Sequence, residues 1–239
     1  SVGEDVLVKY QLKKGMELDE LFIEELIFDE EVNKAYNSAI HYLSYRMRSE
    51  GETLQYLREK GFSEPLIREA IFRLKQRDYL QDDNFAEAYV KNAIQTTDKG
   101  PEVVRRELRE KGIAGDLIDR VLYLFSVEEQ LAKAVKLCEK HRKKKKSSSK
   151  KLLQEEMFAL LRRKGYSGDI SRQAIEKVTE GLQDSDEENA LAIQGEKAWK
   201  KYASEPPEKR ELKVKQFLFR KGFNMELIQK FLADKRLGD

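Results

Sequence analysis

Apolar residues recur at helical spacing in the segment that follows Gly61. Leu66, Ala70, Ile71 and Leu74 stand at positions i, i+4, i+5 and i+8, which lie on one face of an α-helix. The same spacing returns twice further along the chain. The matching residues are Leu117, Val121, Leu122 and Phe125, and then Ile170, Ala174, Ile175 and Val178. The hydrophobic pattern therefore predicts amphipathic helices that repeat along the chain.

A short joint precedes each apolar stripe, and it occurs four times without gaps. The four copies are "LREKGFSEPLIREAI" from Leu57, "LREKGIAGDLIDRVL" from Leu108, "LRRKGYSGDISRQAI" from Leu161 and "LFRKGFNMELIQKFL" from Leu218. Their glycines are Gly61, Gly112, Gly165 and Gly222, which are 51, 53 and 57 residues apart. A period in this range is typical of helical repeat proteins.

The joint has the residues of a helix stop followed at once by a helix start. A glycine in the left-handed conformation ends a helix well when the apolar residue after it contacts one four positions before it, as Leu57 and Phe62 would. The lysine before each glycine suits the negative end of the helix dipole. Three of the residues at the next helix start are good N-caps, and the four are Ser63, Ala114, Ser167 and Asn224.

A further helical stretch precedes each joint, so each unit is predicted to hold three helices. We expect Asp82 or Asp83 to cap the first helix of the second unit. The expected divisions are 1–32 for a truncated N-terminal segment, then repeats at 33–81, 82–127, 128–181 and 186–236, with a basic loop at 139–151. Units of about 50 residues bury little surface alone, so neighbours should stack into an elongated all-α array with helix-turn-helix-like joints.

Composition narrows the class of protein. Charged residues make up 38% of the 239 residues, and only 4 are proline, which favours a helix-rich protein without long strands. A single cysteine excludes an internal disulfide framework, which is consistent with a protein of the reducing cytoplasm. No apolar run is long enough to span a membrane. The first residues are Ser-Val-Gly, without an initiator Met or signal-peptide pattern, so we expect a fragment.

Charge matters through its distribution, because 46 basic and 44 acidic residues nearly cancel to a net +2. The acidic stretch "ELDELFIEELIFDEE", Glu17 to Glu31, is interpreted as a capped amphipathic helix with Leu21, Leu26 and Phe28 available for burial, and less readily as an acidic contact surface. The basic stretch is "KLCEKHRKKKKSSSKKLL", in which only Glu139 is acidic. A Lys-rich loop is as often a plain disordered connection as a phosphate-binding segment.

Candidate binding residues follow from these basic segments. If the loop is functional, it supplies weak, salt-sensitive affinity for single-stranded DNA without sequence preference, and without aromatic residues for base stacking. Three arginines occupy the same position in successive repeats and could form a spaced basic row. Their favourable interaction with the negative end of the helix dipole explains them equally well. The candidates are Lys140, Arg142, Lys143, Lys144, Lys145, Lys146, Lys150 and Lys151 in the loop, and Arg58, Arg109 and Arg162 at the joints.

No catalytic or metal-binding motif is recognised. Cys138 and His141 have a Cys-x-x-His spacing, but the other histidine, His41, is about a hundred residues away, so no metal site is expected. A phosphate-binding loop and a nucleophile-elbow motif are both absent from the sequence. We therefore expect neither an enzyme nor a cofactor.

The chain resembles the RecX family, which regulates the bacterial RecA recombinase. The resemblance rests on "YLQDDNFAEAYVKNAIQTTDKGPEVVRRELREKGI" from Tyr79, "LREKGFS" before it and "VLVKYQLKKGMEL" from Val6, and it spans roughly Val6 to Val178. It implies a non-enzymatic monomer that lies along the RecA filament on single-stranded DNA and restrains it, in DNA repair, recombination and the SOS response. The family usually has three units and an N-terminal β-hairpin region, so a fourth unit around Asn189 to Lys235 is a departure.

Two alternatives stay open beside control of RecA. A tight Gly turn between helices also describes a helix-turn-helix DNA reader, but its outward residues here are mixed in sign: Arg68, Glu69 and Arg73 in one copy, Asp119 and Arg120 in the next. The chain is alternatively a helical-repeat scaffold for another protein. Co-sedimentation with RecA filaments distinguishes these three functions: control of RecA, DNA reading and a scaffold for another protein.

Overall fold

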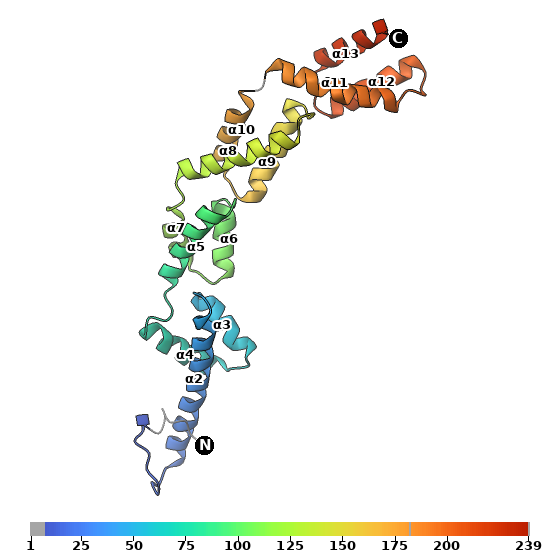
Figure 1. Ribbon diagram of the computed structural model, residues 1–239. Coiled ribbons are helices and arrows are strands. Elements are labelled where there is room, and N and C mark those ends of the chain that lie inside the picture. Colours follow the sequence, from blue (N-terminus) through green and yellow to red (C-terminus); the bar gives the residue numbers. More distant parts are fainter. Residues whose placement is uncertain (1–7, 182, 239) are drawn as a thin grey trace. The chain divides into compact units, whose positions relative to one another are not determined.

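The described part of the chain, residues 8–181 and 183–238 of a computed structural model, folds into helices without a strand (Figure 1). The helices group in threes, and each group contains one of the four joints. The groups are α2 Glu20–Ser44, α3 Glu50–Glu59 and α4 Glu64–Gln76; α5 Asp82–Thr96, α6 Pro101–Glu110 and α7 Gly115–Leu122; α8 Val127–Lys144, α9 Lys150–Lys164 and α10 Gly168–Thr179; and α11 Asp184–Lys201, α12 Pro207–Arg220 and α13 Met225–Gly238. The prediction of an all-α fold of three-helix repeats is confirmed.

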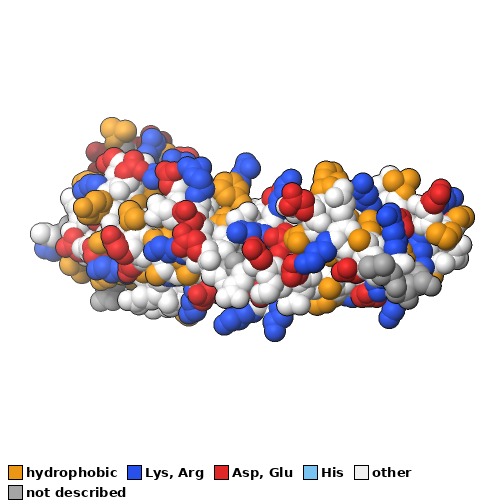
Figure 2. Space-filling model, turned by 90° about the horizontal axis from the view of Figure 1, so that it is seen from above, with side chains coloured by type: hydrophobic (Ala, Val, Ile, Leu, Met, Phe, Trp, Pro, Cys, Tyr) orange, Lys and Arg blue, Asp and Glu red, His pale blue; other side chains and the backbone are white. Residues whose placement is uncertain are grey.

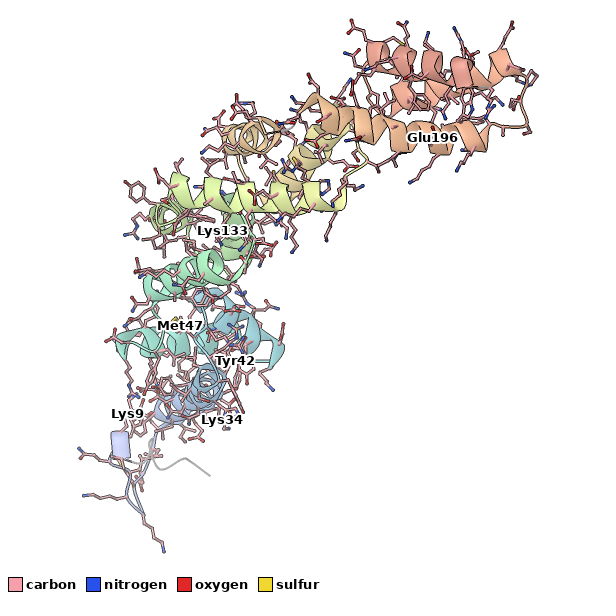
Figure 3. The ribbon with its side chains drawn as sticks, turned by 45° about the horizontal axis from the view of Figure 1, so that its top comes forward. Lys9, Lys34, Tyr42, Met47, Lys133 and Glu196 are labelled. Atoms are coloured by element: carbon pink, nitrogen blue, oxygen red, sulfur yellow. The ribbon has the colours of Figure 1, made fainter. Side chains whose placement is uncertain are left out.

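The helices divide between two compact units. The first unit contains the residues up to 95 together with 105–124, and the second contains 96–104 and the residues from 125 onward. In the first unit, α2 packs mainly on α4, around Leu57, Ile67 and Leu74, which are fully buried. Tyr42, labelled in Figure 3, stacks on Tyr56 with ring centroids 4.0 Å apart.

The second unit holds two hydrophobic cores. One lies among α8, α9 and α10, and its centre includes Met157 and Leu161. The other lies among α11, α12 and α13, around Trp199, Leu218 and Ile228. Each core therefore belongs to one three-helix group.

Each joint has the geometry that its sequence predicts. Gly61 and its three equivalents have φ between 79° and 86°. At the first joint, the amide of Phe62 donates to the carbonyl of Leu57 at 3.2 Å, and the amide of Gly61 donates to that of Arg58 at 2.9 Å. These two bonds define a Schellman motif, and both recur at the other three joints.

The N-caps of the helices that follow the joints agree with the prediction at some positions and differ at others. Ser167 accepts a hydrogen bond from the amide of Ile170 and Asn224 accepts one from Glu226, but Ser63 makes no side-chain cap bond. The expectation that Asp82 or Asp83 caps the first helix of the second repeat is wrong, because α5 begins at Asp82 and both residues lie in its first turn. The carboxylate of Asp82 instead accepts from the amide of Glu50, at the start of α3, at 2.8 Å.

The acidic segment near the N-terminus is the first half of α2, so the division expected at residue 32 falls inside a helix. Asp19 caps it by accepting from the amide of Phe22 at 2.7 Å. Of the three residues expected to be buried, only Leu26 is; the side chains of Leu21 and Phe28 are exposed. The reason is that this half of α2 buries a different face, on which Asp29 pairs with Lys9 and Arg73.

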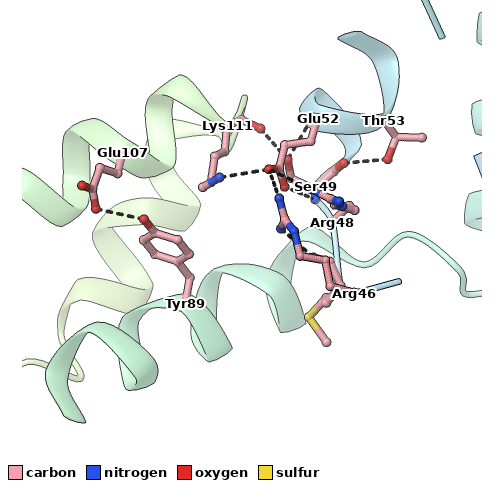
Figure 4. Close-up of polar contacts among 9 residues, drawn as sticks. Arg46, Arg48, Ser49, Glu52, Thr53, Tyr89, Glu107 and Lys111 are labelled. Atoms are coloured by element: carbon pink, nitrogen blue, oxygen red, sulfur yellow. Dashed lines mark hydrogen bonds and ion pairs between the residues drawn. The ribbon is translucent and has the colours of Figure 1, made fainter. Parts of the chain in front are cut away.

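Contacts between successive repeats are made by the joint itself. In the first unit, the hydroxyl of Ser49, which caps α3, donates to the carbonyl of Lys111 at 2.6 Å (Figure 4). A Cβ on Gly51 would lie 2.4 Å from that carbonyl oxygen and 2.8 Å from Cα of Gly112. The start of α3 therefore rests on the joint of the following repeat, where only glycine allows the approach.

The carboxylate of Glu52 completes this contact. It accepts from the side chains of Lys111 at 3.0 Å and Arg46 at 2.9 Å (Figure 4). Burial raises the pKa of Glu52, but these hydrogen bonds outweigh burial and hold the pKa below its usual range. On the same side, Tyr89 donates to Glu107 at 2.9 Å, and burial together with that bond raises the pKa of Tyr89 to about 12.

The second unit repeats the contact twice. The amide of Gly100, just before α6, donates to the carbonyl of Lys164 at 2.7 Å, and the amide of Glu102 donates to the carbonyl of Gly165 at 3.1 Å. The hydroxyl of Ser149, which caps α9, donates to the carbonyl of Lys221 at 2.6 Å. In all three contacts a small residue at the start of a second helix binds the lysine carbonyl of the next joint.

Candidate nucleic-acid interface

The basic candidates of the second unit form one cluster, but most of it is not a loop. The basic cluster consists of Lys140, Arg142, Lys143, Lys144, Lys145, Lys146, Lys150 and Lys151. The helix α8 continues to Lys144 and α9 begins at Lys150, so only residues 145–149 connect them. The loop predicted at 139–151 is corrected accordingly. Basic residues in the last turn of α8 favour the helical state, because they lie at the negative end of its dipole.

The beginning of α9 is unusually positive. Lys150 and Lys151 occupy its first turn, which contains no acidic residue. Cations at a helix N-terminus are unfavourable, because exposed amides already give that end a partial positive charge. An anion such as a phosphate would relieve the repulsion. Ser149 and the first amides of α9 lie against the fourth joint, so it is the exposed side chains of Lys150 and Lys151 that can attract phosphate here.

Acidic residues contact the basic cluster, which the sequence had not indicated. Glu156 accepts from His141 at 2.8 Å and from Lys145 at 3.3 Å. Burial raises the pKa of Glu156, but the bonds from His141 and Lys145 outweigh burial and lower it overall. Arg142 donates to the carbonyl of Val178 at 3.0 Å, so its guanidinium is partly committed to the protein.

A hollow of about 480 Å³ separates the basic cluster from the acidic start of α11. The basic residues Lys143, Lys146 and Lys150 line one side of it. The acidic residues on the other side are Asp184, Asp186 and Glu187. A phosphate that enters this hollow meets both signs of charge, so α11 weakens the attraction that the lysines provide.

The arginines at the joints are placed differently from one another. Arg58 is engaged with Glu64, through its Nε at 2.6 Å and Nη2 at 3.2 Å. Arg109 in the first unit and Arg162 in the second are exposed. The Arg58 pair is solvent-exposed and adds little stability. Arg109 and Arg162 therefore present their charge to solvent more freely than Arg58 does.

The helices that would read a DNA groove are neutralised by their own neighbours. Arg73 binds Asp29 at 2.6 Å and Glu69 at 2.8 Å. Asp119 pairs with Arg105, and Arg120 pairs with Asp83 at 3.2 Å. Figure 2 shows the same interspersion of blue Lys and Arg with red Asp and Glu over the visible face. This pattern opposes a helix-turn-helix reader, which needs a basic face.

The remaining chemical candidates are structural. Cys138 is fully buried, and burial raises its pKa to about 11, so its thiol stays protonated and inert at neutral pH. Within residues 8–181 and 183–238, His, Cys, Asp and Glu nowhere gather in a group that could hold a metal ion. No helix in that part of the chain has the length and apolarity to cross a membrane.

Three family models match the chain, each describing one three-helix domain. The first RecX three-helix domain matches residues 35–74, the second 82–122 and the third 186–232. The third match lies in the fourth repeat of this chain. The similarity therefore continues beyond Val178, where the sequence motifs had placed its end.

Known relatives match over nearly the full chain. Regulatory protein RecX of Bacillus subtilis (strain 168) is 45% identical over 235 residues, covering 98% of this chain and 89% of that protein. Regulatory protein RecX of Geobacillus sp. (strain WCH70) is 40% identical over 242 residues, covering 100% and 88%. The fourth repeat thus has counterparts in these relatives.

Two solved structures share the fold. A crystal structure of regulatory protein RecX superposes with a TM-score of 0.69 at 32% identity, covering 72% of this chain and 87% of that one. The crystal structure of RecX from Lactobacillus salivarius gives 0.61 at 34% identity, covering 64% and 99%.

Proposed function

The chain belongs to the RecX family of regulatory proteins, and from this premise we propose that it binds the RecA filament on single-stranded DNA and inhibits it. The observation that carries the proposal is the similarity to regulatory RecX proteins over 98% of the chain. Under this proposal the protein acts as a cytoplasmic monomer in DNA repair and recombination.

The basic cluster supports a contribution from DNA. Its lysines are exposed at the end of α8, in the connection and at the start of α9, and contacts of lysines with phosphate carry no sequence information. Such contacts give weak, sequence-independent affinity that falls with salt. The DNA contact therefore adds to protein contacts with RecA and does not replace them.

The proposed mode of action is occupancy, without chemistry by this chain. ATP hydrolysis and strand exchange belong to RecA, and a bound regulator lowers both by stabilising filament states in which they proceed slowly. Inhibition should then require amounts substoichiometric or comparable to RecA.

The test is the rate of ATP hydrolysis by RecA on single-stranded DNA, titrated with this chain. We expect the rate and the yield of strand exchange to fall together, while the chain alone hydrolyses no ATP. Co-sedimentation with filaments, with and without nucleotide, reports the bound state directly. Unchanged RecA activity at saturating amounts of this protein would refute the proposal.

The same titration separates the rival functions. A DNA reader would bind duplex DNA tightly with sequence preference and would act on RecA only through competition for DNA. A scaffold for another protein would leave both RecA and DNA unbound. The internal pairing of Arg73, Asp119 and Arg120 argues against the first of these.

A further inference from the structure

Within residues 8–181 and 183–238, three of the four joints are covered by the start of a helix from the preceding repeat, and the first joint is not. At the covered joints the lysine carbonyl accepts from Ser49, Gly100 or Ser149, at 2.6 to 2.7 Å. At the first joint the equivalent atoms belong to Lys60 and Gly61. Among the described residues, no atom lies within 4 Å of the position that a Cβ on Gly61 would take.

Burial distinguishes the first joint in the same way. The apolar residue after the glycine is buried at the covered joints, where it is Ile113, Tyr166 or Phe223. Its equivalent Phe62 is only partly buried. Lys60 is likewise exposed, whereas Lys111, Lys164 and Lys221 are partly buried.

Apolar surface continues beside the first joint. A shallow hollow of about 370 Å³ lies between α2 and the start of α4. Ile27, Phe28, Pro65 and Leu66 line it, and the side chains of Ile27 and Phe28 are exposed to solvent. The side chain of Ser63, which makes no cap bond, also lines this hollow.

We propose that the first joint is a docking site for the N-terminus of a helix from a partner protein. The internal contacts define the chemistry of that helix, because all four joints share the same backbone geometry. Its N-cap residue is small and donates a hydrogen bond, as Ser49, Gly100 and Ser149 do. An acid in its first turn would face Lys60, as Glu52 faces Lys111 at 3.0 Å.

A second copy of this chain does not fit the site. The position equivalent to Ser149 in the last repeat is Pro206, which caps α12 and is followed by Pro207. Proline has neither a hydroxyl nor an amide hydrogen, so it cannot donate to the carbonyl of Lys60. The last repeat therefore lacks the donor that end-to-end assembly of this chain would need, which favours a different protein as the occupant.

The test uses the full chain, labelled with ¹⁵N, and a synthetic helical probe. The probe copies residues 47–60 with Gln55→Lys joined to Glu59 by a side-chain lactam, which keeps the short peptide helical. We expect amide shift changes centred on residues 60–66, without changes at Gly112, whose own helix start is held by the chain at high effective concentration.

Variant probes determine whether binding uses the proposed contacts. Ser49→Ala removes the donor and Gly51→Val adds a Cβ where the internal contact leaves no space, so each should weaken binding at least tenfold. Tyr56→Ala, about two turns from the cap, is the control and should change it little. Lys60→Glu in the protein should weaken binding, and Glu52→Lys in the probe should restore it.

Contrary results are equally clear. No shift changes at residues 60–66 with millimolar probe, or equal binding of the Gly51→Val probe, would overturn the proposal. Concentration-dependent association of the chain alone, abolished by Gly61→Val, would identify a second copy as the occupant and also overturn it. The measurements contain neither RecA nor DNA, so their outcome is independent of the proposed function.

Discussion

At the scale of single residues, the serines that cap α3 and α9 have two roles in one hydroxyl group. Ser149 accepts a hydrogen bond from the amide of Leu152 at 3.2 Å and donates one to the carbonyl of Lys221 at 2.6 Å. Asp and Asn cap isolated helices as well as Ser does, but a carboxylate cannot donate. The contact between repeats therefore selects a hydroxyl, beyond the requirement of the helix itself.

Replacement of Ser149 should show this selection. Ser149→Ala loses both bonds and leaves the Lys221 carbonyl without its donor, so we expect a loss of about 1–3 kcal/mol in the free energy of unfolding. Ser149→Asp should also destabilise, although it restores the cap. The control is Ser167→Ala, an exposed cap with one role, expected to cost about 0.5–1 kcal/mol. Equal losses in denaturant titrations at both sites would contradict the double role.

The glycines of the joints offer a second comparison. Gly61 and Gly112 have φ of 85° and 79°, so alanine is strained at both. A Cβ at Gly112 would also lie 2.9 Å from Cα of Gly51, whereas the position at Gly61 is clear of described atoms. We expect Gly112→Ala to lower the free energy of unfolding by about 1–3 kcal/mol more than Gly61→Ala, through overpacking. Equal melting temperatures of the two variants would refute the close approach.

At the scale of elements, the sequence was sufficient where a feature depends on neighbours along the chain. The Schellman stops join residues five positions apart, such as Leu57 and Phe62, so their pattern is visible directly. The three stacking contacts join residues 62, 64 and 72 positions apart, such as Ser49 with Lys111. No local pattern reports such pairing. One signal was available: Ser49 and Gly100 both precede their own joint glycine by 12 residues, and Ser149 precedes its by 16.

The residues at which helices begin and end were harder to predict, and so were the residues that lie around the basic cluster. The run of lysines was interpreted as a loop, but lysine is a good helix former and suits the end of α8. The acidic start of α11 is about 40 residues from the cluster in sequence, and only the fold places it across the hollow from Lys146.

Neutralising the start of α11 should strengthen DNA binding. Asp184→Asn, Asp186→Asn and Glu187→Gln together remove three charges that face the basic cluster. We expect tighter binding of single-stranded DNA, by about threefold to tenfold at low salt, because nearby like charges no longer repel phosphate. Fluorescence anisotropy with labelled oligonucleotides measures the affinity. A matched triple change at the exposed Glu102, Glu110 and Asp116 should have a smaller effect; equal effects would argue against the role of the hollow.

At the scale of the whole molecule, the charges nearly cancel, but an acidic segment, Glu17 to Glu31, and the basic cluster each concentrate one sign. The sequence has 46 basic and 44 acidic residues. On the face that Figure 2 shows, both signs lie interspersed, and several described residues pair between helices, such as Arg120 with Asp83. A balanced surface attracts DNA weakly. Most of the salt dependence of DNA binding should therefore come from one segment of about a dozen residues.

Removal of four charges from that segment tests this balance. Lys143, Lys144, Lys145 and Lys146 changed to Ser should flatten the salt dependence of single-stranded DNA binding by up to about 3 units of slope, at roughly 0.7 per phosphate contact. Inhibition of RecA should fall less, if helix faces supply the protein contacts. The control changes four lysines outside the basic cluster, Lys75, Lys91, Lys209 and Lys230, each of which pairs with an acid. An unaltered slope in the first variant would exclude the basic cluster as the DNA contact.

The spacing between each helix start and its joint limits how such repeats can change in length. Ser49, the N-cap of α3, lies 12 residues before Gly61, and Ser149, the N-cap of α9, lies 16 before Gly165. The difference of four residues is close to one helical turn, so the added length returns the docking residue to nearly the same side. An insertion of two residues would rotate it by about 200° and face it away from the next joint. An insertion in the second helix of a repeat should therefore keep this contact only when it adds close to a whole turn.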